Sequence, residues 1–300
     1  MTVALPRPTV ASWRHLRVRY THVILLAPAI FLTGAVFWVA MGILLVMSVY
    51  PFLAAGAPRV TLEAWTRFLG DRYYWSVVAT TVWLAVFVTA GTLLLGYPAA
   101  YAMSKIRRPA LLLAAYVILF TPILVSVVVR TYGWLLLLGR EGAVNWLLLR
   151  LGLVTEPVPL IFNLRGVVIA MVHILLPFMV FPILSVVGQL APELKEAAMD
   201  LGATRWQTFR RVTLPLTLPG VVSGAQIVFT LTASAFVTPF LMGGGKVQVL
   251  SGLIYRDMEA VNLSFASVTA FVLLALAVGI LIVSNRWLGF VYARAEVDRL

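Results

Sequence analysis

The chain consists of long apolar runs separated by short polar segments. Each run is about 22–28 residues long with hardly any charge, which is enough to cross a bilayer at roughly 20 residues per helical crossing. Inside hydrocarbon every backbone amide must find its partner within its own segment, so we expect helices. None of the runs shows the period-two alternation of a strand. We therefore predict six transmembrane helices, over residues of about 23–49, 76–103, 110–131, 166–188, 220–242 and 265–288.

Composition points the same way. Hydrophobic residues make up 62% of the chain and charged residues 11%, whereas soluble domains have about 45–50% apolar and about 25% charged residues. The sequence thus predicts an all-α polytopic membrane protein with one transmembrane domain over residues 1–300. The first run is far longer than the roughly 7–15 apolar residues of a secretory signal, so we expect an uncleaved first helix. Cysteine is absent, which leaves no disulfide or thiolate metal site.

The basic residues predict the orientation. The net charge is +12, but the 23 Lys and Arg residues are spread between the apolar runs, and no basic face gathers them as a nucleic-acid partner would need. Basic residues favour the cytoplasmic ends of membrane helices. One side of the six-helix arrangement has 14 of the 23, leaving 9 elsewhere, and both termini are therefore predicted to be cytoplasmic. The 14 are Arg7, Arg14, Arg17, Arg19, Lys105, Arg107, Arg108, Lys195, Arg205, Arg210, Arg211, Arg286, Arg294 and Arg299.

Prolines inside the runs predict bends, because proline removes an amide donor. We expect the largest distortion at Pro177 and Pro182, five residues apart in the fourth run. A distorted membrane helix is tolerated where it faces protein or a wet cavity, so this helix either lines such a cavity or is simply a kinked packing helix. Residues 132–165 are too polar to cross and are expected to form amphipathic helices on the outer surface.

The polar segment 190–219 predicts two short helices that meet at a corner. Pro192 suits the first position of a helix, and Gly202 is placed to adopt a positive φ and end that helix. Thr204 and Gln207 have capping-box spacing and start the second helix. We expect Pro215 to end it, with the next crossing opening at the Pro-Gly pair that follows.

A segment specified this closely indicates one of two roles. The small side chains of Ala197 and Ala198 would let a cytoplasmic partner approach closely. Alternatively, the segment is an interfacial helix that only anchors the bundle. The residues themselves leave both readings open.

The same segment resembles a known family. Glu196-Ala197-Ala198, then Gly202, then Val212-Thr-Leu-Pro215 is similar to the EAA motif of binding-protein-dependent ABC importer permeases, with valine where isoleucine is usual. Further stretches resemble the spermidine/putrescine permease branch, and together they cover about residues 20–290. They are Arg130-Thr-Tyr-Gly-Trp134, Gly142-Ala-Val-Asn145, Leu176-Pro-Phe-Met179, Asp200-Leu-Gly-Ala203 and Gly243-Gly-Gly-Lys246.

The resemblance implies a type I ABC importer permease fold, a multi-pass protein in the lipid of a bacterial inner membrane. It also implies a second, homologous permease subunit, two cytoplasmic ABC ATPase subunits and a periplasmic substrate-binding protein. The family's EAA loop docks into the ATPase as a coupling helix. Carried over to this sequence, the ATPase-coupling residues are Glu196, Ala197, Ala198, Asp200, Gly202, Leu214 and Pro215.

The chain itself is predicted to be neither an enzyme nor a cofactor-binding protein. Its one Gly-Lys pair in a glycine run, Gly245-Lys246, is followed by valine, whereas a phosphate-binding loop needs serine or threonine there. We therefore expect the nucleotide sites on another chain. A self-sufficient secondary transporter would leave the corner segment without a purpose. A membrane enzyme lacks support because the three histidines form no ligand spacing.

The substrate is less well indicated. The branch implies a polyamine or a related small nitrogenous solute, while an opine, an amino-acid-like compound or another small organic solute remains the alternative. No acidic residue lies within the six runs, although a buried cation would favour one. Candidate substrate-pathway residues, each with a structural alternative such as packing or solvation, are Arg130, His173, Thr230, Ser234, Tyr255, Asp257 and Glu259, with the last three expected in an outer loop.

Overall fold

The computed structural model describes the backbone of residues 11–50 and 60–297 and the side chains of residues 26–50 and 60–286. Arg7 and Arg299 lie outside the described residues, as do the side chains of Arg14, Arg17, Arg19 and Arg294. The described part of the chain is helical. Its elements are α1 (Ala11–Val49), α2 (Glu63–Gly70), α3 (Arg72–Met103), α4 (Pro109–Leu124), α5 (Val127–Leu138), α6 (Ala143–Arg150), α7 (Leu164–Gln189), α8 (Pro192–Asp200), α9 (Arg205–Thr208), the π-helix η1 (Phe209–Thr213), α10 (Leu214–Ser234), α11 (Val237–Gly243), α12 (Leu250–Glu259) and α13 (Leu263–Val297).

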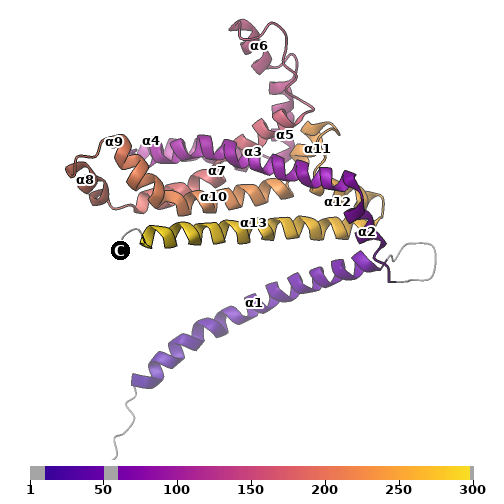
Figure 1. The fold of residues 1–300 in the computed structure, drawn as a ribbon, viewed down its shortest axis with the longest axis horizontal. Helices are drawn as coiled ribbons and strands as arrows, with labels where there is room; N and C mark the ends of the chain where they lie inside the picture. The colour runs from indigo at the N-terminus through magenta and orange to yellow at the C-terminus, as the bar shows by residue number, and fades with distance from the viewer. Residues whose placement is uncertain (1–10, 51–59, 298–300) are drawn as a thin grey trace, which may run out of the picture.

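Within the described residues, five helical segments are long and apolar enough to cross a membrane, and a sixth crossing results if α4 and the bent segment after it form one span. The fold is thus an all-α bundle of about six membrane crossings, as the apolar runs predict. Figure 1 shows the long helices α3, α7, α10 and α13 running side by side, with α1 diverging from them.

The centre of the bundle is formed by α3, α7 and α10, which share the most extensive helix contacts. Fully buried side chains include Leu84 on α3, Val180 on α7 and Val228 on α10. Gly220 lets α10 lie directly on α7, because a Cβ there would be 2.7 Å from the carbonyl oxygen of Pro182. Such close approach at small residues is how helices pack in lipid, where aliphatic burial alone gives little drive.

Proline does not break α7, which continues through Pro177 and Pro182 and is the most buried of the spans. The prediction that this helix is distorted most is therefore not what the structure shows; the breaks lie elsewhere. The helix expected over 110–131 ends at Leu124 and turns by 101° before it continues. The helix expected over 220–242 begins at residue 214 and breaks after Ser234.

A proline lies near each break. Val125 and Ser126 have extended backbones, three and four residues after the proline in the last turn of α4. Ala235 is likewise extended, and Pro239 lies in the first turn of α11 rather than inside a long helix. Proline is tolerated in a first turn because the amides there have no intrahelical partner.

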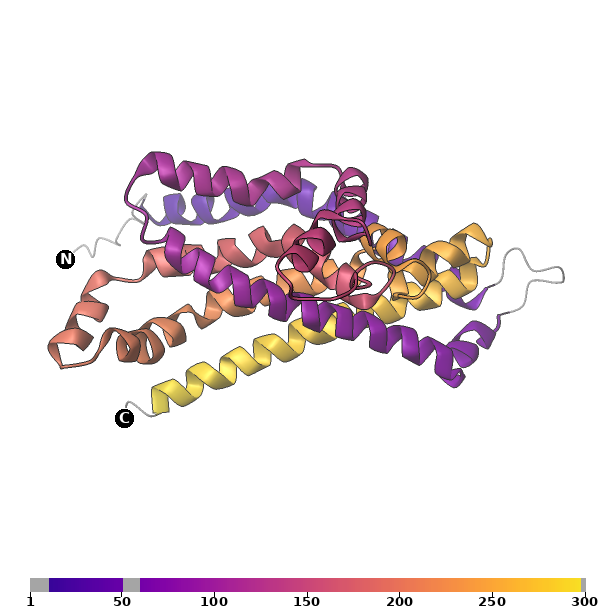
Figure 2. The ribbon, with the colours of Figure 1, turned by 90° about the horizontal axis from the view of Figure 1, so that it is seen from above.

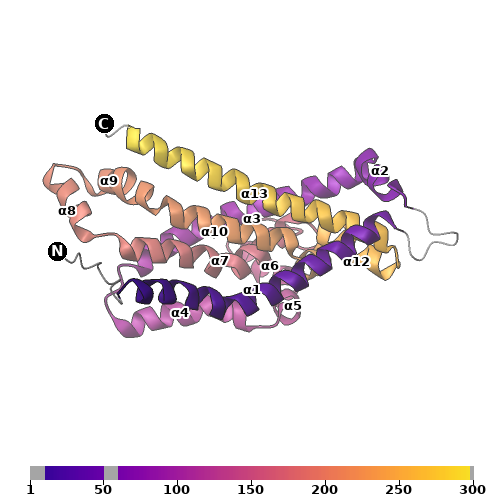
Figure 3. The same cartoon turned by 90° about the horizontal axis from the view of Figure 1, so that it is seen from below.

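Different elements lie at the two ends of the bundle. The first turn of α1, the corner between α8 and α9 and the last turn of α13 lie at one end in all three views (Figures 1, 2 and 3). The other end is formed by α2, α11 and α12. The polar segment 190–219 and the described ends of the chain thus share one end of the molecule.

Candidate coupling loop and membrane pockets

The corner between α8 and α9 is built by Gly202. This residue has φ of +85° and donates its N–H to the Met199 carbonyl at 2.9 Å, while Ala203 donates to the Ala198 carbonyl at 3.0 Å. These two bonds are the Schellman arrangement that ends a helix at a left-handed glycine. Thr204 then starts α9 with a full capping box to Gln207. Both local predictions from the sequence are confirmed here.

The prediction that Pro215 ends the second helix is wrong. Residues Arg205–Ser234 form one continuous helical segment, in which α9 passes through the π-helical turn η1 into α10. A π-helical turn shifts the hydrogen-bond register by one residue, and Pro215 lies in the first turn after it. The missing proline N–H is thereby accommodated, so α9, η1 and the membrane span α10 form one continuous helical segment.

The predicted coupling residues lie together on this projecting corner. None of the α8 residues is buried, and α8 makes its main contacts with α9 and η1. Glu196, Ala197, Asp200 and Gly202 are exposed and Ala198 is half-buried, while Leu214 and Pro215 lie on the first turn of α10.

Apolar side chains at the corner are also open to solvent: Leu201 is 89% exposed and Trp206 is 66% exposed. Exposed apolar groups beside small residues are typical of a surface that a partner covers. The EAA spacing found the small residues, and the solvent-facing Leu201 was missed because no helical periodicity places it.

Aromatic rings connect the corner to the bundle. Phe209, in η1, stacks on Trp206 with ring centroids 5.5 Å apart. It also meets Tyr97 and Tyr101 of α3 edge to face, at 5.9 and 5.4 Å. Tyr97 in turn shares a 2.9 Å hydrogen bond with Thr217 of α10. The corner is thus joined by side-chain contacts to both α3 and α10.

The breaks in the two helices meet at one pocket of about 380 Å³. Thr131 of α5 and Thr238 of α11 hold the two short helices together through hydroxyls 3.2 Å apart. The pocket, here called the break pocket, is lined by Ile123, Val127, Arg130, Met171, Ile174, Leu175, Phe178, Leu231, Ala235, Phe236, Val237 and Thr238. Irregular backbone at membrane depth is tolerated where it lines a cavity, so this is the candidate site along the pathway.

Arg130 is the charged residue of the break pocket. Its guanidinium donates to the Pro122 carbonyl in the last turn of α4, so it satisfies a carbonyl that the break leaves free and sits at the negative end of that helix dipole. Its Nε is buried without a partner. Arg130 therefore stabilises the break and still has a donor directed into protein interior.

The other predicted pathway residues within the bundle do not line this pocket. His173 is exposed on α7, with its ring 5.4 Å from that of Trp134 in an edge-to-face contact. Thr230 has a buried hydroxyl without a partner. Ser234 donates back to the Thr230 carbonyl at 3.0 Å, which is the ordinary helix-packing role of such hydroxyls.

The acidic residues near the end of the bundle are helical, contrary to the predicted loop. Tyr255, Asp257 and Glu259 all belong to α12. A hydrogen bond to the Glu259 carboxylate raises the pKa of Tyr255. Burial raises the pKa of Asp257, an effect that Arg256 and Arg67 partly offset. Glu259 and Tyr255 line a second pocket, and Asp257 does not.

The described residues contain no group of three or more histidine or acidic side chains arranged to hold a metal ion. The two pockets instead offer apolar walls, a hydroxyl at Thr238, the guanidinium groups of Arg130 and Arg256, and the Glu259 carboxylate. Phe236 and Phe240, which border the pockets, were missed because aromatic residues in an apolar run carry no signal that separates a pocket wall from a packed core.

Comparison with known proteins agrees with this geometry. Residues 92–294 match the family described as "binding-protein-dependent transport system inner membrane component". The spermidine/putrescine transport system permease protein PotB of Escherichia coli is 38% identical over 197 residues, 65% of this chain and 70% of that protein. PotB of Haemophilus influenzae is 34% identical over 276 residues, 89% of this chain and 92% of that protein.

A solved structure of similar fold is a bacterial alginate ABC transporter in complex with an alginate-bound periplasmic protein. One of its chains superimposes with a TM-score of 0.66, at 17% identity, over 91% of this chain and 96% of that chain. The chain belongs to the family of binding-protein-dependent transport system inner membrane components: it is a multi-pass inner membrane protein and a permease subunit of an ABC importer.

Proposed function

We propose that this permease imports a polyamine such as spermidine or putrescine, or a closely related small nitrogenous solute. The observation that carries the proposal is the likeness to PotB over nearly the whole chain. The full importer then contains a second, homologous permease subunit, two cytoplasmic ABC ATPase subunits and a periplasmic substrate-binding protein. Both termini and the α8–α9 corner are cytoplasmic in this arrangement, a proposal supported by the common end at which α1 begins, α13 ends and the corner lies.

The ATPase binds the exposed corner between α8 and α9. The exposed face of Ala197 and the exposed Leu201 and Trp206 supply a surface that loses little conformational entropy on docking, because the Schellman motif and the capping box already fix it. Glu196 and Asp200, at the exposed face of α8, offer charges to the rim of such an interface, where they orient the partner.

Movement of the corner is transmitted to the break pocket through one continuous helical segment. The helical segment Arg205–Ser234 has 30 residues, which is roughly 45 Å at the α-helical rise. Its far end is Leu231 and the break at Ala235, both of which line the break pocket. This segment, pivoted by the ATPases, thus opens or closes the pocket, and the breaks act as the hinges that absorb the change.

A second substrate class is favoured by one observation. The unpartnered Nε of Arg130 is a donor that a carboxylate would accept, which suits an amino-acid-like or opine substrate better than a polycation. The two classes therefore differ at the break pocket: a carboxylate is attracted there and a bare polyamine is repelled.

A matched pair of solutes separates them. Uptake of labelled spermidine and, in parallel, of labelled arginine would be measured in vesicles that contain the assembled importer, its binding protein and ATP, with unlabelled agmatine or arginine as competitor. These two solutes differ only by a carboxylate. Competition by agmatine alone supports the polyamine assignment, and competition by arginine alone supports the carboxylate-bearing class. Absence of ATP-driven uptake of spermidine and of arginine would contradict both.

A further inference from the structure

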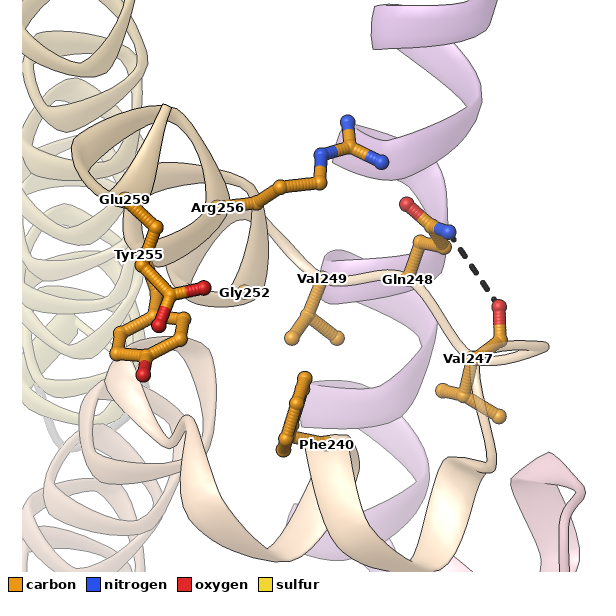
Figure 4. Close-up of a pocket in the computed structure, with 9 residues that line it drawn as sticks. Phe240, Val247, Gln248, Val249, Gly252, Tyr255, Arg256 and Glu259 are labelled. Atoms are coloured by element: carbon orange, nitrogen blue, oxygen red, sulfur yellow. Dashed lines mark hydrogen bonds between the residues drawn. The ribbon is translucent and has the colours of Figure 1, made fainter. Parts of the chain in front are cut away.

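A second pocket lies at the end of the bundle opposite the α8–α9 corner. Its volume is about 140 Å³, and residues of α11, α12 and the intervening loop line it. Figure 4 shows Tyr255 and Glu259 side by side on α12, with Phe240 of α11 across the pocket from them, below Val249. We call it the α12 pocket; besides Tyr255, Glu259 and Phe240 it is lined by Gly245, Val247, Gln248, Val249, Gly252 and Arg256.

The wall formed by α12 follows from helical spacing. Gly252, Tyr255 and Glu259 are three and seven positions apart and so share one face of the helix. Asp257 lies on another face, where burial and the neighbouring Arg67 and Arg256 govern its carboxylate. One carboxylate of the two thus belongs to the pocket.

Aromatic rings complete the pocket. Phe236 stacks on Tyr255 with centroids 4.4 Å apart, and Phe240 lies 6.1 Å from the Tyr255 ring and 5.1 Å from Phe236. Phe240 is 56% exposed and Tyr255 is 41% exposed. Exposed aromatic faces attract a cation through the ring quadrupole, and the Glu259 carboxylate beside Tyr255 (Figure 4) is an acidic group that would attract it as well.

Among the described residues that line the pocket, Arg256 is the one basic side chain, and its guanidinium is bound elsewhere. Arg256 extends away from Tyr255 and Glu259 in Figure 4. Its guanidinium donates to the Tyr73 hydroxyl at 3.5 Å, which itself donates to Gln248 at 2.6 Å. Arg256 therefore joins α12 to α3 and does not occupy the space between the aromatic rings and the Glu259 carboxylate.

We infer that the α12 pocket binds a primary ammonium group, held between the aromatic side chains of Tyr255 and Phe240 and the Glu259 carboxylate. The pocket accommodates one ammonium and the methylenes next to it, so a longer substrate leaves its remaining part outside. Phe236 lines the break pocket and stacks on Tyr255 of the α12 pocket, so one ring connects the two pockets. The claim that the pocket binds a polyamine during import rests on the proposed function. The claim that it binds an ammonium group rests on the pocket alone.

The absence of cysteine gives a clean test. Gly252→Cys puts a thiol in the pocket wall and keeps all three recognition residues; the nearest atom to the new Cβ is a Val249 methyl at 3.7 Å, an ordinary contact. In the assembled importer, the rates of thiol labelling by a cationic and an anionic methanethiosulfonate of equal length would be compared. Relative to the ratio of the two reagents with a free thiol in solution, we expect the cationic reagent to be favoured at least roughly threefold, the effect of one unit charge several ångströms away in water.

Two further variants assign that preference. Adding Glu259→Gln should abolish it, whereas adding Asp257→Asn, a matched carboxylate on another face of α12, should leave it intact. Methylammonium should slow the labelling relative to an equal concentration of sodium, and spermidine should slow it at lower concentration.

The outcomes separate the site from the substrate assignment. A preference unchanged by Glu259→Gln, no protection by methylammonium, or no labelling by either reagent would each overturn the ammonium site. Protection by methylammonium without protection by spermidine would support the ammonium site and remove its role in polyamine import. Because labelling needs no ATP, failure of spermidine uptake in vesicles would count against the proposed substrate and not against the site.

Discussion

Gly202→Val tests the corner of the coupling loop. No atom lies within 4 Å of a Cβ built on Gly202, so the substitution causes no clash. The whole effect comes from the φ of +85°, which costs an L-residue about 1–2 kcal/mol. Relaxing that angle would break the bonds to the carbonyls of Met199 and Ala198, each worth about 0.5–1.5 kcal/mol. By either route the docking-competent corner becomes roughly 5–30 times rarer relative to its alternatives.

The assay is ATP-driven uptake per assembled importer in vesicles, measured beside membrane abundance. We expect uptake to fall by the same factor while abundance stays normal, because the buried core is untouched. Gly202→Asn should retain most of the uptake, since asparagine visits left-handed conformations. Gly152→Val is the matched control: Gly152 also has positive φ, +66°, and open space, but lies after α6. Normal uptake by Gly202→Val at normal abundance would refute the role of the corner.

Three further substitutions test the rest of the structure. Gly220→Ala should destabilise the purified protein by about 1–3 kcal/mol, because its Cβ would lie 2.7 Å from the Pro182 carbonyl oxygen. Gly188→Ala, with no neighbour within 4 Å of its Cβ, is the control and should leave the melting temperature unchanged. Equal melting temperatures of the two variants would contradict the α7–α10 packing. Arg130→Leu should cost about 1–3 kcal/mol by unpairing the carbonyl that ends α4, seen as a lower melting temperature, and unaltered melting would remove the capping role. Burial raises the pKa of Asp257, so the native state disfavours the carboxylate and loses stability as pH rises from the unfolded-state pKa to the folded-state pKa. Asp257→Asn should therefore raise the melting temperature at pH 7, and this gain should vanish below the ordinary aspartate pKa. A gain independent of pH would contradict the burial argument.

The sequence predicts much of the fold, because lipid imposes a simple rule. A membrane helix must be long and apolar, so α3, α7 and α13 are visible as runs. The corner of the coupling loop is equally predictable from the sequence, because Gly202 and the Thr204–Gln207 pair follow local rules of helix ending and capping. These features depend on residues close together in the chain.

Features that depend on tertiary packing could not be predicted from the sequence in the same way. Pro177 and Pro182 indicate a broken helix, yet α7 stays intact because α3 and α10 pack along it. Conversely, the break after Ser234 has little sequence signal beyond Pro239, and the π-helical turn before Pro215 has none. Proline marks where an amide is missing, but the surrounding helices decide whether the chain bends there.

The candidate sites divide along the same line. Arg130, Tyr255 and Glu259 could be named from the sequence as polar groups near apolar runs, and each lines a pocket. The sequence could not show that Glu259 lines a pocket while Asp257 lies near arginines, because that difference arises from α12, a helix where a loop was expected. The aromatic walls at Phe236 and Phe240 require the break that brings α11 beside α12.

Energy coupling is the central claim, and it is tested most directly by uptake with defined components. The chain would be reconstituted in vesicles with its partner permease and ATPases, with substrate-loaded binding protein outside and ATP inside. We expect uptake and ATP hydrolysis that rise together when the loaded binding protein is added, because delivery of substrate and closure of the ATPases favour the same state of the permease. Vesicles containing this chain alone should neither hydrolyse ATP nor take up substrate. Uptake by the chain alone, driven by an ion gradient without ATP, would contradict the account.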